Sequence, residues 1–328
     1  MLKNLKINKG IKMILVLSVV FLLGFFTQMI MSGDKTTATR DNSFRHQDPG
    51  EMFTNPLLDC ADLSNLPNGK VFGLRDEVVD LVEKNRQKGT ISDGAVYFRD
   101  LNNGPWFGYN EKNDFYPASL LKVPLMIAAY REEMQNPGFL QKKFRMPGND
   151  FNEIENYKVS STEKEGRLIS VGEALESMIK FSDNNSAYLL SREIDKKVYS
   201  NTYEDLGIGV PNAPDYVISV RTYASFFRLL YNSTYISRQF SEQALKLLSE
   251  VDFKDGIVAG VPPNIRVSHK FGEREVENGV KQLHDCGIVY SENYPYLICV
   301  MTRGKDYGEM AKVVAEISRI VYDGVEKN

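Results

Sequence analysis

The chain opens with its longest uninterrupted apolar stretch. Residues 13–32 carry no charge and are rich in Leu, Val, Phe, Ile and Met, whereas the twelve residues before them include four lysines. Twenty such residues can cross a bilayer as a helix, and the lysines predict that residues 1–12 stay in the cytoplasm. Because no small-residue cleavage site follows, we expect a single-pass signal anchor with the remaining chain outside; secretion after cleavage is the alternative.

The patterns that follow predict helices and strands at both ends of the exported part. Residues 33–70 are polar and lack periodicity, which predicts a linker. Apolar residues at helical spacing predict helices over 73–86 and 308–322. Short alternating runs predict strands at 94–100, 106–109, 265–271, 283–290 and 296–302.

The middle of the chain carries almost only helical patterns. Ser170 followed by Glu173 forms a capping box, which predicts that a helix starts there. Strands and helices at both ends with helices between them predict an α/β part, 71–117 and 264–328, interrupted by an all-α insertion, 118–263. A cleft between two such parts is a usual place for a site.

Composition narrows the function classes. A formal net charge of −3, without a basic run beyond the first residues, excludes a nucleic-acid partner. The few His and Cys residues show no metal-ligand spacing, so neither a metal site nor a cofactor is predicted. Of the three cysteines, Cys60, Cys286 and Cys299, one must lack a partner within the chain, and the strand register leaves open whether the last two meet.

One motif combines a nucleophile with a base. S-x-x-K occurs at Ser32, Ser119, Ser161 and Ser177, but only Ser119 stands at a predicted helix start before an apolar run. Spacing of three places the Ser119 hydroxyl and the Lys122 amine on one helical face, and a serine needs such a neighbour to take its proton. Alone, the pair is better explained as a capping serine and a solvated lysine.

Two further motifs are ordinary when considered singly. Ser182-Asp183-Asn184 follows the capped helix and could simply cap the next helix, 187–192. Lys270-Phe271-Gly272 ends a predicted strand, where a lysine before a glycine usually marks an exposed turn.

Taken in this order, the three motifs resemble the signatures of the penicillin-recognising serine enzymes. The segments around them are similar to class A β-lactamases, and the resemblance spans about 73–325. It implies the serine β-lactamase-like fold, an antiparallel sheet flanked by N- and C-terminal helices with an inserted helical domain.

The resemblance also implies roles for the catalytic residues. Ser119 is expected to attack a carbonyl and become acylated, while Lys122 accepts its proton, which requires a lowered lysine pKa. Ser182 is expected to relay a proton to the leaving nitrogen. Lys270 is expected to hold Ser182 and attract a substrate carboxylate.

The remaining implied roles concern substrate binding. Asn184 is expected to position the substrate and Lys122. Gly272 belongs to the strand that receives the substrate. The backbone N–H groups of Ser119 and Glu273 are expected to form an oxyanion hole.

Two departures from the family pattern change the expected activity. The glutamate that class A enzymes use to free the acyl group is missing between the second and third motifs, and Phe271 replaces the usual Thr or Ser. We therefore expect a cell-wall enzyme of antibiotic response whose acyl-enzyme with β-lactams or peptidoglycan stem peptides is released slowly. One alternative is a non-catalytic wall-binding or scaffolding protein, and another is a true β-lactamase in which Asp215 replaces the glutamate. The oligomeric state stays open.

Overall fold

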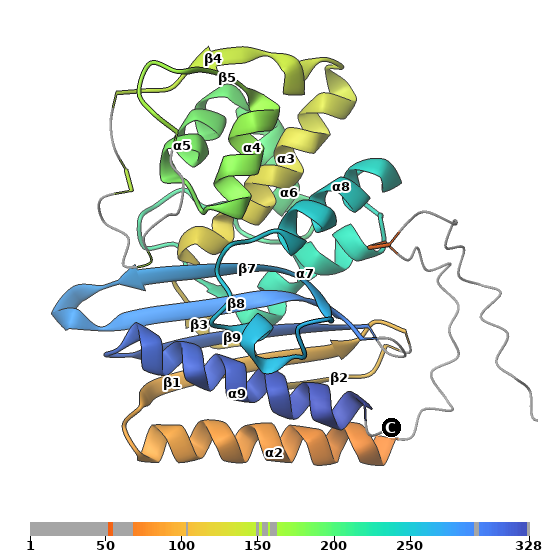
Figure 1. Ribbon diagram of the computed structural model, residues 1–328, viewed down its shortest axis with the longest axis vertical. Coiled ribbons are helices and arrows are strands. Elements are labelled where there is room, and N and C mark those ends of the chain that lie inside the picture. The colour runs from red at the N-terminus through yellow and green to blue at the C-terminus, as the bar shows by residue number, and fades with distance from the viewer. Residues whose placement is uncertain are drawn as a thin grey trace, which may run out of the picture. The chain divides into compact units, whose positions relative to one another are not determined.

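Five strands form one antiparallel sheet in the order β2-β1-β9-β8-β7 (Figure 1). The structure is a computed structural model, and it describes residues 52–54, 68–102, 104–148, 151–152, 157, 163–291 and 295–326. The strands are β1 (Ile91–Asp100), β2 (Trp106–Tyr109), β7 (Arg266–Glu275), β8 (Lys281–Tyr290) and β9 (Tyr296–Gly304). Each strand predicted from alternation overlaps one of them.

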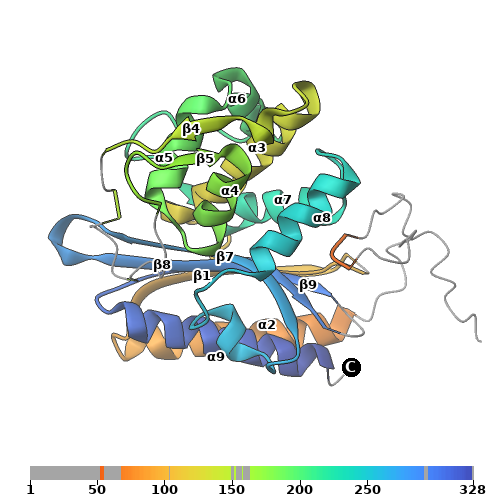
Figure 2. The same ribbon diagram turned by 45° about the horizontal axis from the view of Figure 1, so that its top comes forward.

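Helices cover both faces of the sheet (Figures 1 and 2). The terminal helices α2 (Asn68–Gln87) and α9 (Tyr307–Glu326) lie together on one face, where α9 buries an apolar stripe that includes Val314, Ile317 and Val321. This is the antiparallel sheet with flanking terminal helices that the sequence predicts. The helix α2 begins at Asn68, so it includes the last residues of the predicted linker.

The helical insertion lies on the other face (Figure 1). Its α4 starts with the predicted capping box, in which the Ser170 hydroxyl accepts from the Glu173 N–H and the Glu173 carboxylate accepts from the Ser170 N–H. The insertion helices are α3 (Lys122–Gln135), α4 (Val171–Lys180), α5 (Asn184–Glu193), α6 (Lys196–Glu204), α7 (Val220–Tyr231) and α8 (Arg238–Ser249).

Two small ladders were not predicted. They pair β3 (Asp114–Phe115) with β6 (Ile218–Ser219), and β4 (Lys143–Arg145) with β5 (Leu168–Ser170). Two or three residues are too few to display an alternating pattern, so the sequence carries no signal for them. The first ladder ties the chain just before Ser119 to the start of α7.

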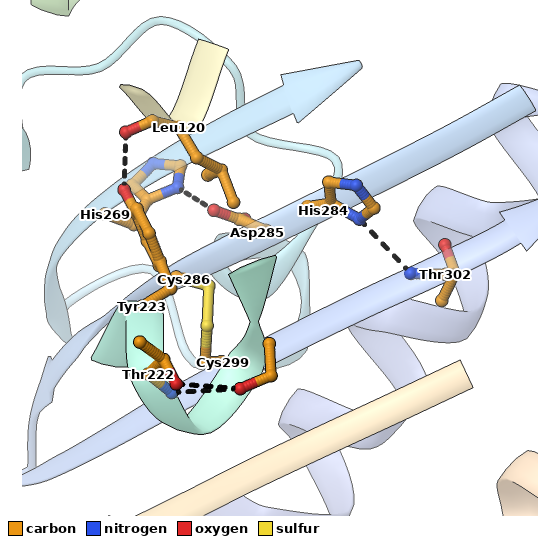
Figure 3. The surroundings of a disulfide bond; sticks show 10 residues. Leu120, Thr222, Tyr223, His269, His284, Asp285, Cys286, Cys299 and Thr302 are labelled. Carbon is orange, nitrogen blue, oxygen red and sulfur yellow. Dashed lines mark hydrogen bonds and ion pairs between the residues drawn. A yellow bond between two sulfur atoms is a disulfide. The ribbon is translucent and has the colours of Figure 1, made fainter. Parts of the chain in front are cut away.

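The register of β8 and β9 places Cys286 directly opposite Cys299, and a disulfide joins them (Figure 3). Both residues are fully buried, and their Cα atoms are 4.0 Å apart. Lys270 is the residue opposite Cys286 on the other neighbouring strand, β7. The disulfide therefore cross-links the sheet next to the third motif. Cys60 lies outside the described residues.

The described residues all belong to one unit, His46–Asn328. None of the helices in the described part is long and apolar enough to span a membrane. The predicted cytoplasmic segment 1–12 and the predicted anchor 13–32 lie outside the described residues.

Candidate active site

Ser119 sits where a strained loop turns into a helix. It lies in a short 3₁₀ helix, η2 (Ala118–Leu121), that continues directly into α3. The residue before it, Ala118, has φ +49°, a left-handed conformation that non-glycine residues seldom adopt. Such a conformation costs on the order of 1–3 kcal/mol and persists only where the surroundings hold it.

Hydrogen bonds from distant elements hold this segment at both ends. The Tyr116 N–H donates to Gln282 Oε1 at 3.1 Å, and His284 Nε2 lies 2.9 Å from the Tyr116 carbonyl oxygen. On the other side, the buried Tyr223 hydroxyl donates to the Leu120 carbonyl at 2.8 Å (Figure 3). Two strand residues and one helix residue thus fix the backbone on either side of Ser119.

The contacts of His284 determine its charge and tautomer. Its Nδ1 accepts from the Thr302 N–H at 3.3 Å (Figure 3). The proton must therefore reside on Nε2, which donates to the Tyr116 carbonyl. Burial away from water lowers the pKa of His284 to about 4. The ring is therefore neutral at pH 7.

Gly272 lets the nucleophile approach the edge strand. A Cβ atom at this position would lie 2.8 Å from the Pro117 carbonyl oxygen and 3.0 Å from the Leu120 nitrogen. Both distances are too short for a side chain, so η2 can rest against β7 only because the residue is glycine. This close approach brings Ser119 and Glu273 to one cavity.

The hydroxyl of Ser182 lies between the two lysines of the other motifs. Its Oγ atom is 3.0 Å from Nζ of Lys122 and 3.0 Å from Nζ of Lys270. Lys122 also donates to the Ser182 carbonyl and, at 2.7 Å, to Asn184 Oδ1. All three motifs therefore converge, with Lys122, Ser182 and Lys270 buried. Among the described residues, none is hydrogen-bonded to the Ser119 hydroxyl.

This geometry limits the protonation states that can work. A charged Lys122 has three N–H bonds and no lone pair, and three acceptors of the second motif lie within hydrogen-bonding distance of its Nζ atom. A neutral Lys122 has two N–H bonds and one lone pair, which can accept the proton of one hydroxyl at a time, that of Ser119 or that of Ser182. Only the neutral form can take a proton from Ser119.

The second motif is itself a strained turn. Ser182 has φ +58°, and Asp183 rather than Ser182 caps α5, which begins at Asn184 and not at residue 187. The Asp183 carboxylate also accepts from Asn152 Nδ2 at 2.7 Å, and the Asn184 amide donates to the Phe151 carbonyl at 2.9 Å. These bonds direct the Asn184 oxygen toward Lys122.

A cavity of about 840 Å³ opens beside these groups. One wall is formed by β7 and includes Glu273, while the other walls come from α3, α5 and α6. The lining residues are Ala118, Ser119, Leu121, Lys122, Leu125, Phe151, Asn184, Ala187, Tyr188, Ser191, Ile194, Lys196, Tyr199, Glu273, Arg274, Glu275 and Tyr307. A site of this size and mixed polarity can hold a small organic substrate.

The position between Lys270 and Gly272 offers hydrocarbon instead of a hydroxyl. The Phe271 ring is buried and stacks on Phe253 with ring centroids 4.3 Å apart. The Nζ atom of Lys270 lies 4.1 Å from the Phe271 ring centroid. The expected hydroxyl contact with a substrate carboxylate is therefore replaced by an aromatic contact with the lysine.

The acids that line the cavity are Glu273 and Glu275, both on β7. Glu273 Oε1 accepts from the Tyr157 N–H at 2.9 Å, which fixes this side chain at the wall. Asp215 is exposed in a turn and is not a lining residue. Within the described ranges, no cluster of three His, Cys, Asp or Glu residues could hold a metal ion.

Sequence reasoning missed the residues that support the nucleophile. Gln282, His284 and Tyr223 belong to ordinary strand and helix patterns, with no motif around them. Nothing local marks a side chain that contacts a backbone N–H or carbonyl group more than a hundred residues away. Their role becomes visible only when β8 and α7 meet η2.

Several solved structures have this fold. PBP-A is 21% identical, with a TM-score of 0.67 and coverage of 78% of this chain and 97% of that one. A β-lactamase from Chitinophaga pinensis is 20% identical, with a TM-score of 0.66 and coverage of 77% and 99%. The class A β-lactamase from Mycobacterium abscessus is 20% identical, with a TM-score of 0.63 and coverage of 77% and 99%. At this identity the likeness establishes the fold.

Comparison with curated proteins finds no match. The family comparison is more informative, since a model of the β-lactamase enzyme family matches residues 73–325, which contain all three motifs and the whole sheet. The chain belongs to the β-lactamase enzyme family.

Proposed function

We propose that this protein is a penicillin-binding type of serine acyl enzyme, acylated at Ser119 by β-lactams or peptidoglycan stem peptides. The observation that carries the proposal is the Ser182 hydroxyl between Lys122 and Lys270, beside a cavity that Ser119 lines. The contacts of Ser182 with the two lysines support a proton path from Lys122 through Ser182 to a leaving group.

The reaction follows from these positions. The Ser119 oxygen attacks the carbonyl carbon, and its proton passes to the Lys122 amine. The oxyanion receives the N–H groups of Ser119 and Glu273, a contribution of about 3 kcal/mol per donor in comparable sites. When the C–N bond breaks, Ser182 gives its proton to the leaving nitrogen and regains one from Lys122.

Slow release of the acyl group is part of the proposal. Hydrolysis of the acyl-enzyme needs a base that activates a water molecule. The sequence lacks the glutamate that class A enzymes use for this step, and the acids that line the cavity, Glu273 and Glu275, lie on β7 instead. A variant of PBP-A, 20% identical to this chain, was captured as an acyl-enzyme complex with penicillin G. That similarity supports a long-lived adduct here.

The test is intact-mass measurement after incubation with penicillin G. We expect one adduct of the mass of the drug, absent in Ser119→Ala, with a lifetime of minutes or longer. Ser177→Ala is the matched control, because Ser177 also begins an S-x-x-K sequence but donates to Glu163 at 2.8 Å on α4. An absence of adduct at millimolar penicillin contradicts the proposal.

A second candidate is a non-catalytic wall-binding or scaffolding protein. The buried Phe271, which replaces a substrate-binding hydroxyl, favours it. It predicts binding of peptidoglycan without covalent modification. Turnover of any amide or lactam that depends on Lys122 excludes it.

We further propose that residues 13–32 anchor the protein in the membrane with the catalytic domain outside. The proposal rests on the apolar run and the lysines before it. Protease added to intact cells should remove the domain and leave the cytoplasmic end protected. Resistance until the cells are opened contradicts this orientation.

A further inference from the structure

The cavity extends well beyond the reacting groups, along one face of α5. Asn184, Ala187, Tyr188 and Ser191 line it, at spacings of three, one and three residues. Asn184 is bound to Lys122, whereas Ser191 lies seven residues further along the helix. At 1.5 Å per residue, the cavity runs about 10 Å from the reacting groups.

Apolar side chains dominate this part of the cavity, which we name the α5 lobe and define by Leu121, Leu125, Ala187, Tyr188, Ser191 and Ile194. The one hydroxyl of an aliphatic side chain in it, that of Ser191, donates to the Tyr188 carbonyl at 2.7 Å and so is already engaged. The Tyr188 ring packs on Phe151 with centroids 4.6 Å apart. Apart from the hydroxyl of Tyr188, the lobe thus presents mainly hydrocarbon to a ligand.

Two of the charged lining residues lie beside this lobe: Lys122 belongs to the reacting groups, and Lys196 follows Ile194 by two residues. The other charged lining residues are on β7. Glu273, Arg274 and Glu275 are consecutive on β7 and line the opposite wall. Arg274 is the lining cation of this wall, and Lys270 on the same strand is expected to attract a carboxylate, so an ionised carboxylate of the acyl donor is assigned to β7. The other half, which carries the carbonyl carbon that Ser119 attacks, is then left the α5 lobe.

We propose that the α5 lobe binds an unbranched apolar or aryl group on the acyl half of the substrate, up to about 10 Å long. The inference rests on the proposed acylation of Ser119 and adds its substrate class: amides or lactams with an extended apolar acyl side chain. The lobe selects them because each methylene buried there leaves water.

The test measures rate constants for acylation of the whole protein by penicillins with straight alkanoyl side chains of increasing length, with 6-aminopenicillanic acid as the reference that has none. We expect about a two- to fourfold rise per methylene, ending near eight carbons, where the lobe ends. In Ala187→Phe, which fills the lobe near Asn184, the ratio of long-chain to reference rate constants should fall at least tenfold. In Ser191→Phe, which fills its far end, the rise should stop at a shorter chain.

Lys197→Phe is the matched control. Lys197 is exposed on α6 beside the lobe and does not line the cavity, so the same ring added there should leave the ratio unchanged. A flat chain-length series in the wild type, with Ser119 still acylated by the reference, overturns the inference and leaves the proposed function intact. A steep series unchanged in both lobe variants also overturns it. Lack of any adduct removes the proposed function itself.

Discussion

The Nζ atom of Lys270 lies 3.0 Å from the hydroxyl oxygen of Ser182. Because Lys122 contacts the same oxygen, Ser182→Ala should interrupt proton transfer and lower the acylation rate constant by about a hundredfold or more. Stopped-flow measurement with a fluorescent penicillin checks this. Ser186→Ala is the matched control: its buried hydroxyl has no partner among the described residues, so both rate and stability should change little. Equal losses in the two variants contradict the relay.

A pH dependence of stability follows from His284. Its pKa is lowered from 6.5 to about 4 by burial, so the unfolded chain binds a proton at a higher pH than the folded one. The contribution of neutral His284 to the free energy of unfolding is fully present above pH 7. It is lost as the pH falls from about 6.5 to 4, and the total loss is about 3 kcal/mol.

The measurement is the urea midpoint of unfolding between pH 4 and 7.5. His284→Gln keeps a side-chain amide that can donate to Tyr116 but cannot titrate. The variant should therefore lose less stability than the wild type across this window. Parallel curves for the two proteins contradict the assignment.

Gly272→Ala should separate the nucleophile from the edge strand. The new methyl group would meet the Pro117 carbonyl at 2.8 Å, so η2 must shift. We expect a destabilisation of about 1–3 kcal/mol and at least a tenfold fall in acylation rate. Gly209→Ala is the control, because a Cβ there meets nothing within 4 Å. Wild-type acylation in Gly272→Ala contradicts the close approach.

The disulfide between Cys286 and Cys299 predicts that neither sulfur atom reacts with an alkylating reagent before reduction. Cys286 and Cys299 should resist alkylation in the unfolded, unreduced protein and gain two labels after reduction, as measured by intact mass. Cys286→Ala with Cys299→Ala should lower the free energy of unfolding by about 2–3 kcal/mol, since the bond closes a short loop. Three labels without reduction, one of them on Cys60, show that the bond is absent.

A carboxylate holds the chain segment that precedes the domain. Glu242 accepts from the N–H groups of Phe53 and Thr54 at 2.9 Å each, and Phe53 packs edge-on against Tyr290. Glu242→Gln should weaken this attachment and speed proteolysis near residue 53 several-fold. Glu176→Gln, which breaks only a surface ion pair on α4, is the control. Unchanged cleavage in Glu242→Gln contradicts a role in attachment.

The sequence by itself determined the order of elements and the fold. Alternation and helical spacing predict the five strands and the terminal helices because burying one face of each element requires those periods. Three short motifs, weak when taken singly, also predicted the residues that converge on the cavity. Local patterns failed for β3 to β6, which are too short, and for the cap of α5, which is Asp183.

Only the tertiary structure decided how the site is held. Whether Cys286 faces Cys299 depends on the register of β8 and β9, and a shift by one residue would place the two side chains on opposite faces of the sheet. The support of Tyr116 by His284, the close approach at Gly272 and the apolar α5 lobe each arise between elements far apart in the chain. Such distances are set by the packing of whole elements, which no stretch of residues encodes locally.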